Sequence, residues 1–290
     1  MNIPKLYIGT AGWSYDDWVP NFYPCSQSKD MSWLQYYSRY FNVVEVNSTY
    51  YTYLSQRIFQ SWLRQIENAD DFLFTVKLHQ DFTHRKRYGD EQIRAVKANL
   101  DILKNAERLG GLLLQFPYSF AYDQTNVDYV QQLIEIFEEY DKFVEVRHKS
   151  WQTKNAKTIT FCTIDQPKIG ESIEFKPVVG NQMAYIRFHG RNEEAWRKSI
   201  ANFGKKTSYE EQSERYKYLY SPGELAEVDF KIKEIYDRVK KVFVILNNHP
   251  TGDAVANAFE LLHYLKNIPK VKMPPTIVKA YPRLEKIATN

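Results

Sequence analysis

The stretch YIRFHG at residues 185–190 alternates like a buried strand, yet it carries Arg187 and His189 on one face. Side chains two residues apart on a strand point to the same side, so these two polar groups lie together. Ile186 and Phe188 take the other face, which suits the layer between a sheet and its helices. Because removing an ion from water costs several kcal/mol, Arg187 must either be paired or take part in function.

Seven more runs rich in Val, Ile, Leu and Phe resemble this one. The eight expected strands are 6–9, 43–47, 72–79, 110–116, 143–148, 158–165, 183–189 and 242–249. Most are separated by segments of helical periodicity, and strands that alternate with helices predict a parallel sheet covered by helices. Eight such units match the closed (β/α)₈ barrel, which typically takes about 250 residues. We therefore expect an α/β protein with one TIM-barrel domain spanning residues 1–290.

An open doubly wound sheet is the rival architecture. It calls for a glycine-rich phosphate loop after the first strand, but GTAGWSY places Trp13 where the backbone must approach a dinucleotide closely. The chain also has no GK[ST] loop of the Walker type. Both observations favour the barrel.

Two segments depart from the regular alternation. Between residues 165 and 183 the chain contains Pro167, Gly170, Pro177 and Gly180, which predicts that the sixth helix is shortened or missing. Residues 190–228 form a long insertion after the seventh strand, and it ends where Ser221 is suited to cap a helix. A proline-containing tail is expected over about 270–290.

The composition is that of a soluble globular protein, with 43% hydrophobic and 26% charged residues. A net charge of +4 allows an anionic partner without requiring one. Cys25 and Cys162 are too few and too far apart for a disulfide scaffold, and no signal peptide or membrane-length apolar run is present. We expect a cytoplasmic protein with no membrane partner, and the oligomeric state stays open.

Alternation places a set of polar side chains on the inner face of the barrel. The set comprises Glu45, Asn47, Lys77, His79, Gln115, Glu145, Arg147, Thr163, Asp165, Arg187, His189, Asn247 and His249. They gather toward the carboxyl ends of the strands, where barrel enzymes place their sites. Two interpretations stay open, because a structural network of ion pairs and an active site both bring opposite charges together.

The functional interpretation is an enzyme that acts on a phosphate-bearing or nucleic-acid-like substrate, of the phosphoester hydrolase type. Arg147 and Arg187 suit a phosphate because the planar guanidinium binds two oxygens at once. Lys77 and His189 are the candidates for proton transfer, and Glu45 and Glu145 for positioning a water. The expected partner is a small-molecule or nucleic-acid anion.

Two other functions use the same residues differently. Glu45 and Glu145 are candidates for the acid and base of glycoside cleavage, with the aromatic loop at residues 13–23 stacking on sugars. Alternatively, the basic and aromatic segment 191–218 is typical of a non-catalytic module that binds nucleic acid or a protein.

A metal site is disfavoured by the spacing of the ligands. His79, His189 and His249 would be joined by the nearby carboxylates, but no HxH, HExxH or DxD pattern occurs. Lys77, Arg147 and Arg187 would also repel a cation. We expect neither a metal nor another cofactor.

Seven motifs, in order, resemble the domain of unknown function 72 family, the YecE-like proteins. They are IGTAGWSYDDW, VVEVNSTYY, FTHR, LLLQFP, VEVRHKSW, YIRFHG and NNHPTGDA. The resemblance implies a TIM barrel similar to, though distinct from, the xylose-isomerase and endonuclease-IV barrels, and it implies no established activity. It adds Gly12, Thr83, His84 and Asn248 to the positions of interest, while His249 departs from the expected acidic or amide residue.

The predicted site therefore combines the residues found by alternation along the strands with those added by the family resemblance. The catalytic candidates are Glu45, Lys77, Glu145 and His189. The substrate-binding candidates are Trp13, Asn47, His79, His84, Gln115, Arg147, Arg187, Asn247 and Asn248.

Overall fold

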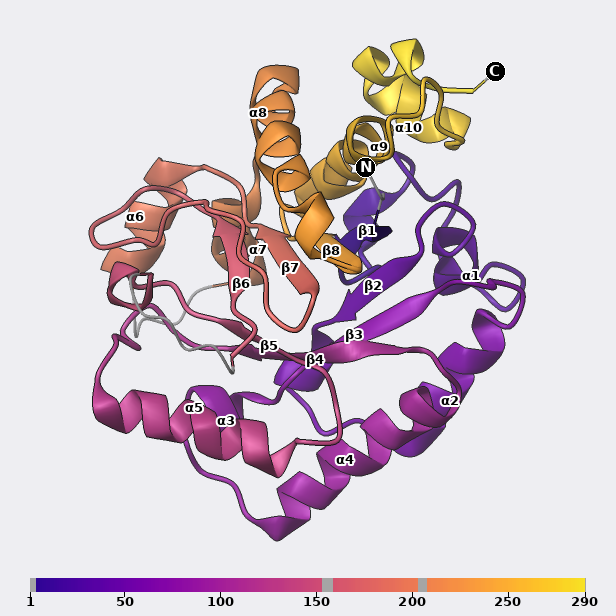
Figure 1. The fold of residues 1–290 in the computed structure, drawn as a ribbon. Helices are drawn as coiled ribbons and strands as arrows, with labels where there is room; N and C mark the ends of the chain where they lie inside the picture. The colour runs from indigo at the N-terminus through magenta and orange to yellow at the C-terminus, as the bar shows by residue number, and fades with distance from the viewer. Residues whose placement is uncertain (1–3, 153–158, 203–207, 290) are drawn as a thin grey trace.

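The computed structural model describes residues 4–152, 159–202 and 208–289, and it contains eight parallel strands in a nearly closed barrel surrounded by helices (Figure 1). The strands are β1 Lys5–Ala11, β2 Val43–Val46, β3 Leu73–Lys77, β4 Leu109–Gln115, β5 Lys142–Glu145, β6 Cys162–Asp165, β7 Met183–Phe188 and β8 Lys241–Leu246. Their order is β5-β4-β3-β2-β1-β8-β7-β6, so β1 pairs with β8 and, except between β5 and β6, consecutive strands pair with each other. The predicted (β/α)₈ fold is confirmed.

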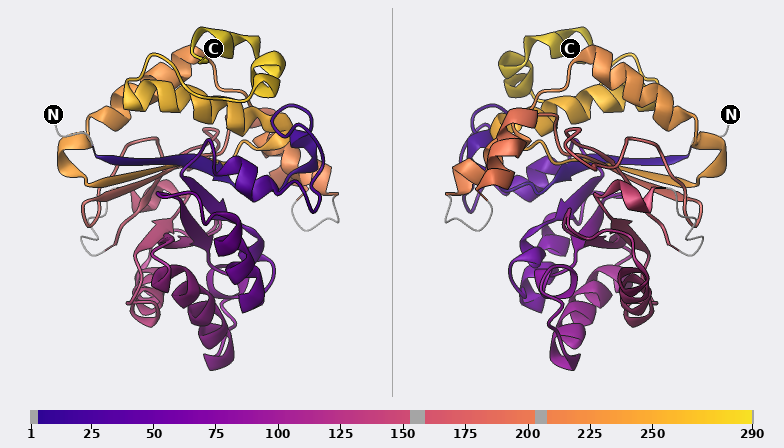
Figure 2. Two further views of the ribbon diagram at one scale, coloured as in Figure 1. Left: turned by 90° about the vertical axis from the view of Figure 1, so that its right-hand side faces the viewer. Right: turned by 90° about the vertical axis from the view of Figure 1, so that its left-hand side faces the viewer.

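The helices cover the outside of the barrel. They are α1 Trp33–Tyr37, α2 Gln56–Gln65, α3 Gln80–Thr83, α4 Asp90–Asn105, α5 Gln124–Ile136, α6 Glu193–Ala201, α7 Tyr209–Ser213, α8 Pro222–Lys233, α9 Asp253–Lys266 and α10 Pro275–Ala280. Figure 2 shows α8 and α9 on the opposite side of the barrel from α4 and α5. Helix α8 begins as predicted, because the Ser221 side chain accepts a hydrogen bond from the Glu224 amide at 3.3 Å.

The junction between β5 and β6 is the weak seam of the barrel. A single bridge, Val144 to Phe161, joins these strands in the described chain. The segment after β6 covers the seam, because His148 pairs with Ser172 and the Ile173 amide donates to the Arg147 carbonyl at 2.9 Å. The prediction that the sixth helix is shortened or missing is confirmed, because residues 166–182 contain no helix and cover the seam instead.

The fifth connection also lacks an α-helix among its described residues, which the sequence pattern did not indicate. Its described residues end at 152 and contain a short 3₁₀ turn at Lys149–Trp151. Trp151 is buried there and its indole donates to the Phe120 carbonyl at 2.8 Å. The Trp151 ring also packs against Phe120, Tyr122 and Phe161 on this side of the barrel.

The barrel interior is filled in layers. Aromatic rings close its amino-terminal half, where Tyr7 stacks on Phe243 at 4.9 Å and Phe143 stacks on Tyr185 at 4.4 Å between ring centroids. The apolar positions that alternate with the inward polar ones pack against the helices instead. The carboxyl-terminal half is therefore left for the polar side chains.

Strand β6 contradicts the predicted inward face. Cys162 and Ile164 belong to the interior cluster, so Thr163 and Asp165 point outward. Asp165 accepts a hydrogen bond from the Tyr220 hydroxyl at 2.7 Å, outside the barrel wall. The prediction that Asp165 faces the interior was wrong, because the apolar members of the strand fill the core.

The tail after residue 270 packs against α9 and the first loop. Arg283 donates to Glu260 of α9 at 2.6 Å, and the Thr276 hydroxyl donates to the Phe22 carbonyl at 3.0 Å. A parallel bridge between Val271 and Ala288 closes the tail on itself. Within the described residues, no helix combines the length and the apolar character needed to cross a bilayer.

Candidate functional site

A cavity of about 440 Å³ opens at the carboxyl-terminal end of the strands. Seven predicted site residues line it: Trp13, Asn47, Lys77, Gln115, Arg147, Arg187 and Asn247. A volume of this size suits a metabolite-sized ligand. The cavity thus lies where barrel enzymes hold their substrates.

The floor of the cavity is a buried ionic network centred on Arg187. Its Nε and Nη2 donate to the two carboxylate oxygens of Glu45 at 2.9 and 2.6 Å, while Nη1 pairs with Glu145. The Tyr185 hydroxyl donates to Glu45 at 2.8 Å. Arg187 is only 2% exposed and both glutamates are 0% exposed, so each charge depends on the others for compensation.

Glu145 extends this network to β5 and to the end of β7. Arg147 Nη2 lies 2.7 Å from Glu145 Oε1 and 3.2 Å from His189 Nε2. Burial opposes ionisation of Glu145, but Arg187 and Arg147 prevail and hold its pKa well below the usual range. The carboxyl group therefore stays ionised and cannot donate a proton near neutral pH.

His189 is a neutral member of the network. It is fully buried, and Asn247 Nδ2 lies 3.0 Å from its Nδ1. Burial and the nearby Arg147 lower the pKa of His189 to about 3. A base this weak is poorly matched to proton transfer near pH 7. The predicted catalytic role of His189 therefore gains no support from its surroundings.

Lys77 reaches the cavity from the end of β3. Its Nζ lies 4.1 Å from the centre of the Tyr50 ring. Burial is the main cause that lowers the pKa of Lys77 to about 7, and the charge of Arg187 acts in the same direction. Part of its surface still lines the cavity. Lys77 can therefore gain or lose a proton near neutral pH.

Three predicted binding residues lie outside the cavity lining. His79 caps α3, where its Nδ1 accepts from the Asp81 amide at 3.2 Å and its ring stacks on Tyr53. Strand β3 ends at Lys77, so the expected alternation does not extend to His79. The His84 ring packs edge-on against the Tyr50 ring, with 5.1 Å between the ring centroids.

Asn248 is the third of these residues. Its Nδ2 donates to the Tyr218 carbonyl at 2.8 Å and to Asn257 at 3.0 Å, away from the cavity. Neighbouring positions at the end of β8 thus have different surroundings: Asn247 lines the cavity, whereas Asn248 ties the strand to α9.

The first loop contributes less to the cavity than its many aromatic residues suggested. Trp18, Phe22 and Tyr23 are fully buried, and the Trp18 indole donates to the His249 carbonyl at 2.8 Å. Trp13 and Tyr15 alone among the five loop aromatics line the cavity. Most of the loop aromatics therefore hold the loop in place.

Arg215 is a cavity residue that the sequence analysis missed. It lies in the insertion after β7, where its guanidinium is 5.2 Å from the Trp196 ring and 4.8 Å from the Tyr216 ring. It lines the cavity together with Tyr216, which the basic and aromatic character of 191–218 had indicated. The fold brings this distant segment over the mouth.

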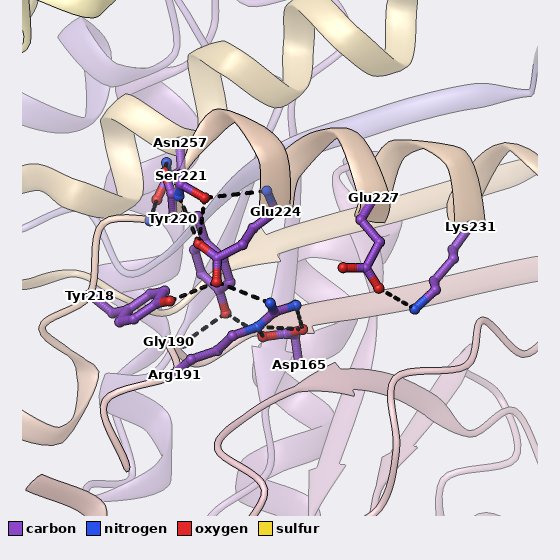
Figure 3. Close-up of polar contacts among 10 residues, drawn as sticks. All are labelled: Asp165, Gly190, Arg191, Tyr218, Tyr220, Ser221, Glu224, Glu227, Lys231 and Asn257. Carbon is purple, nitrogen blue, oxygen red and sulfur yellow. Dashed lines mark hydrogen bonds and ion pairs between the residues drawn. The ribbon is translucent and has the colours of Figure 1, made fainter. Parts of the chain in front are cut away.

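A second polar network holds the insertion over the barrel. Figure 3 shows Arg191 between Asp165 at the end of β6 and Glu224 in the first turn of α8. Arg191 donates to the two Asp165 oxygens at 2.9 and 2.6 Å and to Glu224 at 3.0 Å. Tyr218 and Tyr220 also donate to these carboxylates, both from the chain that follows Arg215.

The cavity lining is strongly cationic. Its charged members are Lys77, Arg147, Arg187 and Arg215, and no Asp or Glu of the described chain is among the lining residues. Across residues 4–152, 159–202 and 208–289, no group of three or more His, Cys, Asp or Glu side chains is arranged to hold a metal ion. The lining is thus complementary to an anion.

Comparison with known proteins assigns this chain to a family. Residues 7–279 match the family described as Protein of unknown function DUF72. The chain belongs to the DUF72 family. It is 29% identical over 280 residues to the UPF0759 protein YunF of Bacillus subtilis, which covers 90% of this chain and 94% of YunF. It is also 28% identical over 157 residues to the UPF0759 protein YecE of Escherichia coli, which covers 53% of each chain.

Crystal structures of DUF72 family proteins share the fold. One from Thermotoga maritima is 32% identical, with 90% of this chain and 99% of that chain covered and a TM-score of 0.75. Another from Enterococcus faecalis is 24% identical, covers 90% and 95% of the two chains, and has a TM-score of 0.73. The family resemblance that the seven motifs indicated is confirmed.

The geometry of this DUF72 chain bears on the glycosidase alternative. A glycosidase needs one carboxyl group that donates a proton and a second that faces the sugar or a water. Here Glu45 and Glu145 are fully buried and bound by arginines, and Glu145 is held ionised. This arrangement does not support carbohydrate cleavage by this pair.

Proposed function

We propose that this DUF72 protein is an enzyme whose substrate carries a phosphate or carboxylate group, which binds in the cavity at the barrel mouth. The observation that carries the proposal is the cavity lining, with four cationic side chains and no described carboxylate. Guanidinium groups bind such anions through two parallel hydrogen bonds. Metabolites and single nucleotides both fall within this substrate class.

The balance of charge supports an anionic ligand. Glu45 and Glu145 are matched by Arg187 and Arg147, so the buried network needs no further cation. Arg215 is an additional positive charge at the cavity, and Lys77 is another whenever it is protonated. A bound anion would compensate them in a site partly screened from water.

The same geometry limits which residues can take part in catalysis. Phosphoester hydrolysis would need a group that activates water, but Glu45, Glu145 and His189 are enclosed in the network and absent from the cavity lining. Lys77 does line the cavity, and its pKa of about 7 suits proton transfer at neutral pH. We therefore assign Lys77 the role of acid or base.

Replacing Arg215 tests the anion site without disturbing the buried network. We expect Arg215→Met to weaken binding of inorganic phosphate or a nucleoside monophosphate by about tenfold or more, because a charge-assisted hydrogen bond contributes about 1.5–3 kcal/mol. Isothermal titration calorimetry at low salt measures this. Raising the salt concentration should weaken wild-type binding as well.

The matched control is Arg197→Met on α6. Arg197 is exposed in the same insertion and pairs with Glu193 four residues earlier. Its replacement should leave the affinity unchanged. Equal affinity of wild type and Arg215→Met, or no binding of any anion in the panel by the wild type, would count against the proposal.

A further inference from the structure

Lys77 differs from the other cations of the cavity in having no polar partner. Within the described residues its Nζ makes no hydrogen bond and no ion pair, and it lies 4.1 Å from the centre of the Tyr50 ring. Arg147 and Arg187 pair with glutamates, and Arg215 donates to the Ser199 hydroxyl at 3.2 Å. The amine is thus left available to a ligand.

Lys142 shows that partial burial does not by itself leave a lysine amine without a polar partner. Burial also lowers the pKa of Lys142, at the start of β5. Its Nζ, however, donates to the carbonyl oxygens of Phe137 at 2.9 Å and Tyr140 at 2.7 Å. Lys142 is therefore held by the backbone, whereas Lys77 faces an open cavity.

Charges from several elements surround Lys77. Those that act on it are Arg187 on β7, Glu45 on β2, and Glu145 and Arg147 at the end of β5, while Lys77 itself acts on His84 after α3. Burial and the arginines favour the neutral amine, and the glutamates oppose it. A neutral lysine beside fixed cations is a nucleophile toward carbonyl groups.

We propose that Lys77 forms an imine with the carbonyl carbon of an anionic substrate, such as a 2-oxo acid or a keto phosphate. The proposal rests on the proposed anion site, because Arg147 and Arg215 hold the carboxylate or phosphate while the carbonyl group meets Nζ. It adds a substrate class and a covalent step to that site, in which the neutral amine of Lys77 acts as a nucleophile in place of the acid or base role.

The step is balanced without any oxidant or reductant. The lone pair of Nζ forms a bond to the carbonyl carbon, and one amine hydrogen is transferred to the carbonyl oxygen to give a carbinolamine. The hydroxyl group then leaves with the second amine hydrogen as water, and the C=N bond forms. When the imine is protonated, the Tyr50 ring stabilises the cation as it does the ammonium group.

Reductive trapping tests the imine. The whole protein is incubated with glyoxylate, pyruvate or dihydroxyacetone phosphate together with cyanoborohydride, and the modified peptides are mapped by mass spectrometry. We expect modification of Lys77 at least about tenfold faster than of any other lysine near pH 7, because ordinary lysines are almost fully protonated there. Lys142 is the internal control, and the neutral ketone dihydroxyacetone should react much more slowly at Lys77.

The pH dependence provides a second readout. The rate of trapping at Lys77 should rise as the pH passes through about 7, where its amine loses the proton. Ordinary surface lysines should gain reactivity only closer to pH 10. A rise confined to the high range at Lys77 would overturn the proposal.

Two variants separate the imine from the anion site. Lys77→Arg keeps a positive charge and should bind the anion without forming an adduct, whereas Lys77→Met lacks the charge as well; circular dichroism verifies that both fold. Anion binding by the wild type without an adduct at Lys77 would overturn the imine and leave the proposed function standing. Failure of the wild type to bind any of these anions in calorimetry would overturn the proposed function.

Discussion

Arg187 shows how one residue can belong both to the core and to a site. All three nitrogens of its guanidinium pair with Glu45 or Glu145, and the same side chain forms part of the cavity floor. The structural and functional interpretations of the inward charges are therefore not alternatives at this position. The lower pairs hold the cavity floor in place, and the cations above it face the cavity.

Replacing Arg187 should destabilise the protein strongly. We expect Arg187→Met to lower the free energy of unfolding by about 3–5 kcal/mol, because it leaves Glu45 buried without its partner. The double variant Glu45→Gln with Arg187→Met should recover part of this loss, since Glu145 keeps its pair with Arg147. Urea unfolding of the two variants measures the difference, and a double variant less stable than the single one would contradict the argument.

Alternation along the strands identified most of the inward residues correctly, because the two faces of a strand follow from sequence parity. Parity gave no information on depth. Glu45 and Lys77 both face inward, but Glu45 lies beneath the cavity and Lys77 lines it. The depth depends on the stagger between neighbouring strands, which is set by pairing and cannot be read from one strand alone.

At the scale of elements, the insertion after β7 completes the cavity. The network of Arg191, Asp165 and Glu224 ties the start of this insertion to β6 and α8 (Figure 3). Arg215 lies between these anchored ends and reaches the mouth. The position of Arg215 at the cavity mouth thus depends on contacts outside the cavity.

Breaking this network should destabilise the protein and increase the mobility of the segment that carries Arg215. We expect Arg191→Met to lower the free energy of unfolding by about 2–3 kcal/mol, because Asp165 loses its charged donor. It should also accelerate amide hydrogen exchange over residues 214–224, and mass spectrometry measures this. Lys231→Met is the matched control, since its exposed pair with Glu227 on α8 should contribute less than about 1 kcal/mol. Equal effects of the two variants would count against an anchoring role.

The sequence predicted strands and caps better than connections. The start of α8 followed from Ser221 and Glu224, whose side-chain chemistry is local. The role of Arg215 did not follow, because the path of a long insertion depends on distant anchors such as Asp165. The prediction for β6 failed because its apolar residues Cys162 and Ile164 fill the interior, while the outward Asp165 is paired with Arg191 of the distant insertion.

At the scale of the molecule, burial of neutral histidines makes stability depend on pH. The pKa values of His189 and His249 are lowered from the ordinary 6.5 to about 3 and about 4, mainly by burial. In the unfolded chain both groups take up protons below about pH 6.5, whereas in the folded protein they stay neutral. Their contribution to stability is therefore present above pH 6.5 and is lost as the pH falls toward 4.

Chemical denaturation at several pH values checks this expectation. The free energy of unfolding should fall by about 1.4 kcal/mol per pH unit for each of these histidines between pH 6 and 4. His189→Gln should reduce that slope by about the contribution of one histidine. A free energy of unfolding that stays constant over this range would show that the two rings are protonated in the folded state.

The overall architecture was predictable because eight apolar runs and their helical spacers repeat along the chain. A closed barrel was expected from the number of units, but the way in which the segment after β6 covers the seam was not, because that segment has neither strand nor helix periodicity. There the Ile173 amide binds the Arg147 carbonyl, and the Arg147 guanidinium donates to Gln166 at 3.1 Å. Long-range hydrogen bonds of this kind leave no local signal.

The covered seam between β5 and β6 links occupancy of the cavity to the integrity of the wall. Because Arg147 belongs to both the seam and the cavity lining, any fluctuation that separates these strands also moves a cation away from the cavity. By thermodynamic reciprocity, a ligand held by Arg147 should suppress that opening. Separation of β5 and β6 should then be least frequent when the cavity is occupied.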